Sequence, residues 1–230
     1  MSADELARLA TQHACDKWNV HWYAGPYAFH LEALRNREFT LLELGIGGEH
    51  VPNSGGASLR MWRDYFRKAQ IIGLDLHDKS HVASDRIRTY QGSQADPVTI
   101  ARIIQDAPHG FDVVIDDGSH RSEHVIASLV MLWPYVNSGG WYAIEDLQTS
   151  YWPHYGGALY DRGSAQTSMG FLKSLIDGVN WQEIHQPTYS PSQFELTLTS
   201  IHFYHNLVFL RKGSNTEGST TLNDNRLPGL

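Results

Sequence analysis

The sequence predicts an α/β fold in which a doubly wound, mostly parallel sheet ends in an antiparallel C-terminal hairpin. Five short, largely apolar runs alternate with segments of helical periodicity, and this alternation is typical of parallel strands joined by right-handed crossovers. Several of the runs end in carboxylates. A length of 230 residues favours one domain, because domains usually contain roughly 100 to 200 residues.

The five runs are expected to form the parallel strands. Strands that are buried on both faces read as continuous apolar sequence, and most of these runs end at glycines or acids. The sequence Ser138-Gly139-Gly140 is expected to be a turn before the fifth strand. The expected strands are residues 39–45, 70–76, 87–94, 111–117 and 141–147.

Between the runs, apolar residues recur at helical spacing. Residues 55–69 show this spacing, and Asp96 is placed to cap the helix after the third run. Residues 197–212 read as two strands that meet at His205-Asn206, an antiparallel hairpin at the sheet edge. Further helices are expected at residues 2–14, 125–132 and 169–176.

We expect one domain over residues 1–212, which begins with a helical and aromatic segment at residues 1–38. The tail, residues 213–230, is polar and is expected to be loose or docked on a neighbouring chain. A homodimer is therefore an open alternative.

Composition narrows the class of protein. Apolar residues at 41% and charged residues at 19% are typical of a soluble globular protein. A formal charge of −7 argues against binding to nucleic acid, which needs a surplus of Lys and Arg. No apolar run approaches the roughly 18 residues of a membrane span, and no signal peptide is expected. Cys15 is the single cysteine, which suits a reducing, cytoplasmic location.

Glycines after the first strand suit the close approach of a ligand. Glu43, Gly45 and Gly47 form an E-x-G-x-G motif. A dinucleotide fingerprint needs another glycine where this chain has His50, which disfavours a dehydrogenase. The motif resembles that of class I S-adenosylmethionine-dependent methyltransferases.

Two further strand ends extend this interpretation. Asp75 ends the second strand, where such enzymes use an acid to bind both ribose hydroxyls of the methyl donor. Ser93 and Gln94 end the third strand, where adenine would be contacted. Since ligands of open α/β sheets bind beyond the carboxyl ends of the strands, these residues are expected to line one donor site.

Carboxylates follow both the fourth and the fifth strand. If these strands are neighbours, Asp117, Glu145 and Asp146 converge at one edge of the sheet. Converging carboxylates repel one another unless a cation neutralises them, and an all-oxygen set suits Mg2+. Adjacent strand residues point to opposite faces, so Asp117 is expected to bind the metal while Asp116 gives structural support.

His120 is the expected general base. It follows Asp117 by three residues at a helix start, beside the predicted metal and methyl donor. Histidine titrates in the range that removing a proton from a hydroxyl requires. His124 is the weaker alternative, and His202 and His205 are expected to be packing or turn residues.

A more specific resemblance rests on three motifs. The sequence VIDDGSH, the strand SGGWYAIEDL and the segment TSYWPHYGG are similar to the Mg2+-dependent sugar O-methyltransferases of the macrocin, mycinamicin and rhamnosyl type. That group includes the enzymes that methylate mycobacterial methylmannose polysaccharides. The similarity runs from about Asp16 to Lys212, and the large N-terminal domain of the mycinamicin enzyme is not expected in this chain.

The resemblance implies a class I methyltransferase fold and a Mg2+-dependent enzyme. The reaction would move a methyl group from S-adenosylmethionine to a hydroxyl of a sugar or oligosaccharide acceptor, and a methylated mannoside is the favoured guess. The resemblance assigns Asp117, Glu145 and Asp146 as metal ligands and His120 as the general base. Aromatic residues in segments 18–27 and 151–160 are candidates to stack on the sugar. The alternatives are a catechol-type methyltransferase and a nonenzymatic S-adenosylmethionine-binding module.

Overall fold

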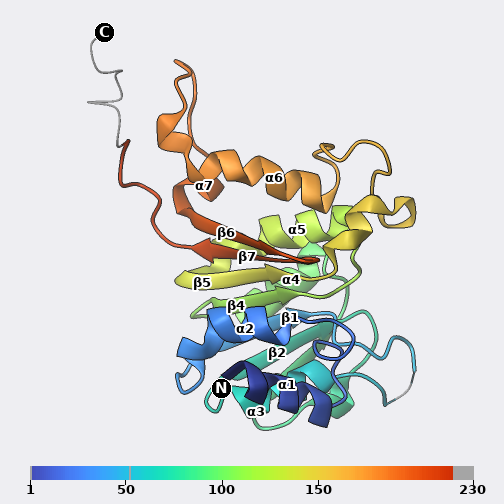
Figure 1. The fold of residues 1–230 in the computed structure, drawn as a ribbon. Coiled ribbons are helices and arrows are strands. Elements are labelled where there is room, and N and C mark those ends of the chain that lie inside the picture. Colours follow the sequence, from blue (N-terminus) through green and yellow to red (C-terminus); the bar gives the residue numbers. More distant parts are fainter. Residues whose placement is uncertain (1, 52, 220–230) are drawn as a thin grey trace.

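A seven-stranded sheet forms the centre of the computed structural model, which describes residues 2–51 and 53–219 (Figure 1). The strand order is β3-β2-β1-β4-β5-β7-β6. Strands β1 to β5 are parallel, whereas β7 runs antiparallel to both of its neighbours. The strands are β1 (Thr40–Leu44), β2 (Gln70–Asp75), β3 (Ile87–Gln91), β4 (Phe111–Asp116), β5 (Val136–Ile144), β6 (Leu198–Tyr204) and β7 (Leu207–Lys212).

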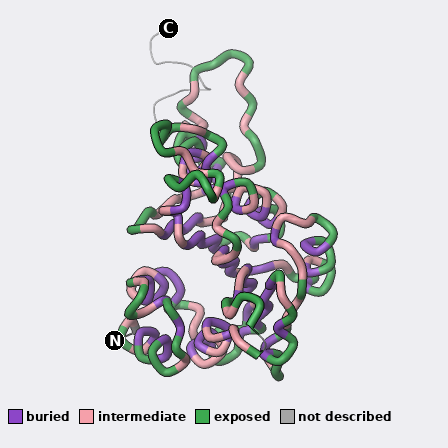
Figure 2. The backbone as a smooth tube through the Cα atoms, turned by 90° about the vertical axis from the view of Figure 1, so that its right-hand side faces the viewer, coloured by how far each residue is buried: buried purple, intermediate pink, exposed green. Residues whose placement is uncertain are grey.

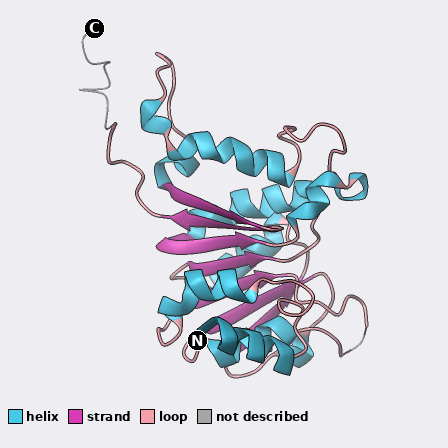
Figure 3. Ribbon diagram, viewed as in Figure 1, coloured by secondary structure: helices cyan, strands magenta, loops and turns pink. Residues whose placement is uncertain are grey.

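Helices cover both faces of the sheet (Figure 3). One core layer packs helices α1, α2 and α3 on the sheet, and the other packs α4, α5 and α6. The helices are α1 (Ser2–Gln12), α2 (Ala24–Leu31), α3 (Ala57–Tyr65), α4 (Pro97–Gln105), α5 (Ser122–Leu132), α6 (Ser168–Val179) and α7 (Gln193–Thr197). Short 3-10 turns lie at Glu32–Leu34, Ser80–Val82, Trp133–Tyr135, Leu147–Tyr151, Pro153–Tyr155 and Trp181–Glu183.

Alternation along the strands separates the two core layers. Leu41 and Val113 belong to one layer, and their neighbours Leu42 and Val114 belong to the other. Successive strand residues point to opposite faces, so continuous apolar runs supply both layers at once. In Figure 2 the buried residues follow the strands through the middle of the molecule, and exposed residues gather on the outer turns.

The predicted parallel strands and the C-terminal hairpin are confirmed, but the start of the fifth strand was predicted wrongly. Strand β5 already begins at Val136, so residues 138–140 lie within it instead of forming a turn. The register explains this difference: Phe111 pairs with Val136, whereas Val113 pairs with Trp141. The extra residues form an irregularity in the strand, which glycine accommodates.

Helix boundaries differ from the predictions where glycine intervenes. Helix α3 begins at Ala57, because Gly55 and Gly56 have φ angles of +99° and +74°. It ends at Tyr65, because Phe66 is extended. The predicted cap of α4 is confirmed, since the Asp96 carboxylate accepts hydrogen bonds from the backbone of Val98 and Thr99.

The start of the tail is anchored on its own chain at Asn215, so the expectation of a loose tail is wrong at this residue, while docking on a neighbouring chain stays a prediction. Asn215 is 3% exposed, and its side-chain amide donates to the backbone oxygens of Gly178, Val179 and Glu195. The amide thus satisfies carbonyls at the end of α6 that the helix itself leaves free. The rest of the predicted tail, residues 220–230, lies outside the described residues. Within the described ranges, no helix has the length and apolar character needed to cross a bilayer.

Candidate active site at the carboxyl edge of the sheet

The loop after β1 needs glycine for two different reasons. A Cβ atom on Gly45 would lie 2.1 Å from the backbone oxygen of Asp117, so a larger residue would displace the end of β4. A Cβ on Gly47 would meet no atom within 4 Å. Both residues have positive φ, at +79° and +68°. The amide of Gly56 donates to the oxygen of Ile46 at 2.6 Å and closes the loop.

This loop forms one wall of a cavity of about 700 Å³ at the ends of the parallel strands. The volume lies in the range of roughly 300 to 1,000 Å³ that is typical of small-molecule sites. Five of the six residues predicted to bind the donor line the cavity: Gly45, Gly47, Asp75, Ser93 and Gln94.

Glu43, the sixth predicted residue, lies beneath the loop and not in the cavity wall. It is fully buried, and one of its oxygens accepts a hydrogen bond of 2.8 Å from the hydroxyl of Ser58. Burial raises the pKa of Glu43 to about 7. Glu43 therefore joins β1 to the start of α3 and supports the glycine loop from below.

Asp75 lines the cavity, and its carboxylate can still accept hydrogen bonds from a ligand. Its carboxylate accepts hydrogen bonds from the amides of Ile46 at 3.1 Å and His77 at 2.9 Å. A carboxylate has about four acceptor positions, so two bonds leave room for hydroxyl donors. Because Asp75 holds the glycine loop through Ile46, it links the two predicted parts of the donor site.

Gln94 uses its side chain within the protein. Its amide nitrogen donates to Asp116 at 2.9 Å, and its oxygen accepts from the backbone of Ser119 at 2.7 Å. The side chain therefore fixes the loop after β4. The hydroxyl of Ser93 accepts a hydrogen bond from the amide of Ala95.

Asp116 and Asp117 point in different directions, as their adjacent positions predict. Asp116 is 1% exposed and accepts hydrogen bonds from Gln94 and from the hydroxyl of Ser128. Burial raises the pKa of Asp116 to about 6. Asp117 instead reaches the cavity wall. The buried, hydrogen-bonded surroundings of Asp116 therefore fit the structural support that was expected of it.

Three ligand atoms converge at the wall of the cavity. One atom each from Asp117, His120 and Asp146 lies within 4.8 Å of the other two. The Nε2 atom of His120 is 3.9 Å from Asp117 Oδ1 and 3.7 Å from Asp146 Oδ2. His120 and Asp146 both have positive φ, at +55° and +52°. Such strained conformations cluster at functional sites.

Glu145, the third predicted metal ligand, is outside this group and faces Lys17. The Nζ atom of Lys17 lies 2.7 Å from Asp117 Oδ2, 2.9 Å from Glu145 Oε1 and 3.4 Å from Glu43 Oε1. Lys17 is 1% exposed. Burial alone would lower its pKa, but the three carboxylates outweigh burial and raise the pKa of Lys17 well above its usual value.

Two tyrosines near Lys17 also contact the acids. The hydroxyl of Tyr27 donates to Glu145 at 2.5 Å, and the hydroxyl of Tyr23 donates to Asp146 at 2.8 Å. Sequence reasoning placed both rings among candidate sugar contacts and gave Lys17 no role. No local signal in the sequence identifies these contacts, because the partners of Lys17, Tyr23 and Tyr27 lie 100 to 128 residues away.

The second aromatic segment, residues 151–160, does not line the cavity. Trp152 is 47% exposed and Tyr160 is 96% exposed, and neither is among the residues that line the cavity. Within the described structure, no residue of the segment 151–160 lines this cavity, and its contact with the acceptor stays a prediction.

The charges and atoms of the site fit a divalent cation. Lys17 contacts three carboxyl groups, those of Glu43, Asp117 and Glu145, and Asp146 adds a carboxyl group beside Asp117 and His120. Carboxylate oxygens are the ligands that Mg2+ prefers, and an excess of clustered negative charge is stabilised by a bound cation.

No protein-family model matches the chain, but curated proteins do. It is 45% identical over 218 residues to 8-demethyl-8-(2-methoxy-alpha-L-rhamnosyl)-tetracenomycin-C 3'-O-methyltransferase of Streptomyces olivaceus. It is 44% identical over 217 residues to mycinamicin VI 2''-O-methyltransferase of Micromonospora griseorubida. This chain is a homologue of the sugar O-methyltransferases. The matches cover 94% and 93% of the chain but 55% and 54% of these relatives, so the chain spans about half their length.

Solved structures agree with this homology. MycE methyltransferase from the mycinamycin pathway, in complex with Mg and SAH, has a TM-score of 0.89 and 44% identity. The match covers 93% of this chain and 56% of that one. An O-methyltransferase from Bacillus cereus, at 12% identity and a TM-score of 0.52, shares the fold alone. The expected resemblance and the class I methyltransferase fold are confirmed.

Proposed function

We propose that the chain is an S-adenosylmethionine-dependent O-methyltransferase that acts on a hydroxyl of a sugar or oligosaccharide with the help of Mg2+. The observation that carries the proposal is the convergence of Asp117, His120 and Asp146 at the wall of the 700 Å³ cavity. The named activities of its relatives and the Mg and SAH bound in MycE support it.

The methyl donor occupies the 700 Å³ cavity in this proposal. Asp75 accepts the ribose hydroxyls, and Gly45 and Gly47 let the backbone approach the donor closely. Ser93 and Gln94 are proposed at the adenine end, where Gln94 acts by fixing the loop after β4. Glu43 acts from beneath, by holding the loop in place through Ser58.

Asp117 and Asp146 hold the metal, with Glu145 as the third ligand predicted from sequence. Glu145 would have to exchange part of its contact with Lys17 and Tyr27 for the ion, since both now donate hydrogen bonds to it. When bound, Mg2+ supplies Lewis-acid polarisation and orientation of the acceptor hydroxyls.

His120 takes the proton from the acceptor hydroxyl. The oxygen attacks the methyl carbon as the carbon–sulfur bond breaks, S-adenosylhomocysteine leaves, and the proton moves to Nε2 of His120. The carboxylates 3.7 and 3.9 Å from Nε2 stabilise the imidazolium that forms. Holding donor and acceptor together supplies much of the rate, because proximity replaces a bimolecular encounter.

The proposal also concerns the identity of the acceptor sugar. A methylated mannoside is the favoured acceptor, and the relatives are named for rhamnosyl and macrolide substrates. Mannose and rhamnose share a cis-2,3-diol, which offers two neighbouring oxygens to one metal. Assembly as a homodimer and a cytoplasmic location stay predictions.

A methyl-transfer screen tests the proposal. Wild-type protein is incubated with S-adenosylmethionine, Mg2+ and a panel of mannosides, rhamnosides and catechols, and products are detected by a mass gain of one methyl group. Methylated glycosides are expected. Methylation of catechols alone would favour the catechol-type alternative, and donor binding without transfer to any panel member would favour a nonenzymatic binding module.

A further inference from the structure

Two acids of the candidate metal site are each held on one oxygen by the segment between α1 and α2. The Nζ atom of Lys17 lies 2.7 Å from Oδ2 of Asp117, and the hydroxyl of Tyr23 donates to Oδ1 of Asp146 at 2.8 Å. Lys17 is 1% exposed and Tyr23 is 4% exposed. Because both side chains are packed in the interior, they restrict how the two acids can turn.

The second oxygen of each acid faces His120. Oδ1 of Asp117 lies 3.9 Å from Nε2 of His120, and Oδ2 of Asp146 lies 3.7 Å from the same nitrogen. Among the described residues, none donates a hydrogen bond to either of these two oxygens. Each acid therefore has one oxygen free for a cation at the cavity wall, while its other oxygen is bound by the segment between α1 and α2.

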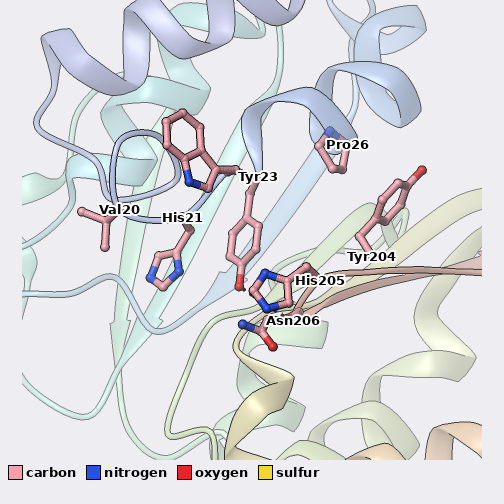
Figure 4. A pocket seen from close by; sticks show the side chains of 8 residues that line it. Val20, His21, Tyr23, Pro26, Tyr204, His205 and Asn206 are labelled. Carbon is pink, nitrogen blue, oxygen red and sulfur yellow. Dashed lines mark hydrogen bonds between the residues drawn. The ribbon is translucent and has the colours of Figure 1, made fainter.

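The surroundings of Tyr23 keep its hydroxyl at Asp146. Tyr23 and His21 line a second cavity, of about 470 Å³, and their rings are stacked with centroids 5.0 Å apart (Figure 4). The hydroxyl of Tyr23 points towards the turn between β6 and β7, where it lies 3.4 Å from the backbone oxygen of Asn206. Nδ1 of His21 lies 3.6 Å from Oδ1 of Asp146, the oxygen that Tyr23 binds. That oxygen is thus surrounded by groups of the protein.

The number of free carboxylate oxygens influences which divalent ion a site prefers. Ca2+ takes about six to eight oxygen ligands and accepts both oxygens of one carboxylate. Mg2+ is smaller, keeps several of its waters and is usually bound through one or two carboxylates. A site in which each acid has a single free oxygen therefore favours the smaller ion.

We infer that Lys17 and Tyr23 set the preference of the metal site for Mg2+ over Ca2+, because each holds one oxygen of an acid and so prevents that acid from binding the larger ion with both oxygens. This inference rests on the proposed function, since it assigns specificity-determining residues to that metal site. Neither Lys17 nor Tyr23 lines the 700 Å³ cavity. Both are positioning residues that act through Asp117 and Asp146.

The test compares the affinities for two ions, so it does not depend on turnover. Isothermal titration calorimetry measures Mg2+ and Ca2+ binding to metal-depleted protein with saturating S-adenosylhomocysteine, and the heat that disappears in Asp117→Asn is assigned to the site. Tyr23→Phe removes one hydroxyl and leaves the charge unchanged. Tyr90→Phe is the matched control, because the Tyr90 hydroxyl donates to Asp106 at 2.5 Å and Tyr90 lines neither cavity.

In Tyr23→Phe, the ratio of Mg2+ affinity to Ca2+ affinity should fall about tenfold, the effect of one hydrogen bond to a charged group. Oδ1 of Asp146 then becomes available to Ca2+, which gains a ligand that Mg2+ does not need. Lys17→Met should shift the ratio in the same direction, because it frees Oδ2 of Asp117. Tyr90→Phe should keep the wild-type ratio. Tyr23→Phe decides the question even if Lys17→Met does not fold.

An unchanged affinity ratio in Tyr23→Phe would overturn the inference. Equal losses of affinity for both ions would also overturn it, because a merely structural role of Tyr23 would weaken both ions alike. Failure of the proposed function would look different, since the ratio would shift in Tyr23→Phe while the wild type methylates no glycoside. If the wild type binds neither ion at this site, both the inference and the proposed function are wrong.

Discussion

The ammonium nitrogen of Lys17 lies 2.7 Å from Oδ2 of Asp117, although the two residues are 100 positions apart in the chain. The same nitrogen contacts Glu145 at 2.9 Å. Asp117 follows β4 and Glu145 follows β5, so one buried cation joins the ends of two strands to the N-terminal segment. The acids are thus held together by a positive charge that belongs to the protein itself.

Replacing this charge should destabilise the protein and increase its dependence on metal. Removing one partner of a buried ion pair leaves an uncompensated charge and typically costs about 3 to 5 kcal/mol. Lys17→Met should therefore unfold at lower urea concentration, and Mg2+ should stabilise it more than it stabilises the wild type. Urea unfolding with and without Mg2+ measures both effects, with exposed Lys68→Met as the control. If Lys17→Met and Lys68→Met unfold at the same urea concentration and gain the same stability from Mg2+, the Lys17 contacts do not contribute to stability.

Two glycines of the same loop should respond differently to alanine. Both have positive φ, so each substitution costs about 1 to 2 kcal/mol of backbone strain. Gly45→Ala also collides with the backbone of Asp117, whereas the new methyl group of Gly47→Ala enters open space at the donor cavity. Gly45→Ala should lose more stability, and Gly47→Ala should lose donor affinity with a smaller change in melting temperature. Calorimetry with S-adenosylhomocysteine and thermal unfolding test this; tight donor binding by Gly47→Ala would place the donor elsewhere.

His120 is a candidate for two roles, general base and metal ligand, and one variant distinguishes them. Removing a general base costs about 10² to 10⁴ in rate. If His120 is the base, His120→Ala keeps its affinity for Mg2+ and donor, and higher pH partly restores turnover because hydroxide takes the proton. His124→Ala is the control, since His124 also lines the cavity. A parallel loss of Mg2+ affinity in His120→Ala would make His120 a ligand, and a larger rate loss in His124→Ala would move the base to that residue.

His30 should make stability depend on pH. Burial, with contributions from His202 and Arg211, lowers the pKa of His30 to about 4 from a usual value of 6.5. The unfolded chain therefore binds a proton below pH 6.5 that the folded protein accepts only near pH 4. Protonation of His30 therefore does not affect the free energy of unfolding above pH 6.5. As the pH falls from 6.5 towards 4, this free energy decreases by at most about 3 kcal/mol.

The matched variants are His30→Gln and His154→Gln, of which only His30 is buried. Urea unfolding between pH 7.5 and 4.5 should show a shallower loss of stability for His30→Gln than for wild type or His154→Gln. Identical slopes for the three proteins would mean that His30 does not control this pH dependence.

Most of the fold could be predicted because its signals are local. Continuous apolar runs mark strands such as Thr40–Leu44 and Phe111–Asp116, and Asp96 caps its helix through neighbouring amides. The start of β5 could not be predicted, because residues 138–140 have turn chemistry and only pairing with β4 extends the strand through them. Asn215 likewise packs against α6 by contacts that span 36 and 37 residues.

The candidate site was predictable where residues follow strand ends. Parallel strands end at the same sheet edge, so Asp75 was expected at the donor site and Asp117, Glu145 and Asp146 were expected to converge. Asp75, Asp117 and Asp146 line one cavity, whereas Glu145 faces Lys17. The contacts of Lys17, Tyr23 and Tyr27 depend instead on how the N-terminal segment crosses the sheet edge. Nothing within that segment specifies those partners, which lie 100 to 128 residues away.

The most direct test of the central claim is methyl transfer by the wild-type protein to a neutral rhamnoside or mannoside after treatment with EDTA, and again after Mg2+ is added back. Ligand atoms of Asp117, His120 and Asp146 converge as a metal site would require, so we expect no methylated glycoside in EDTA and full recovery with Mg2+. Donor binding, followed by calorimetry in the same samples, should persist throughout. Full turnover in EDTA would contradict metal-dependent transfer at Asp117, His120 and Asp146.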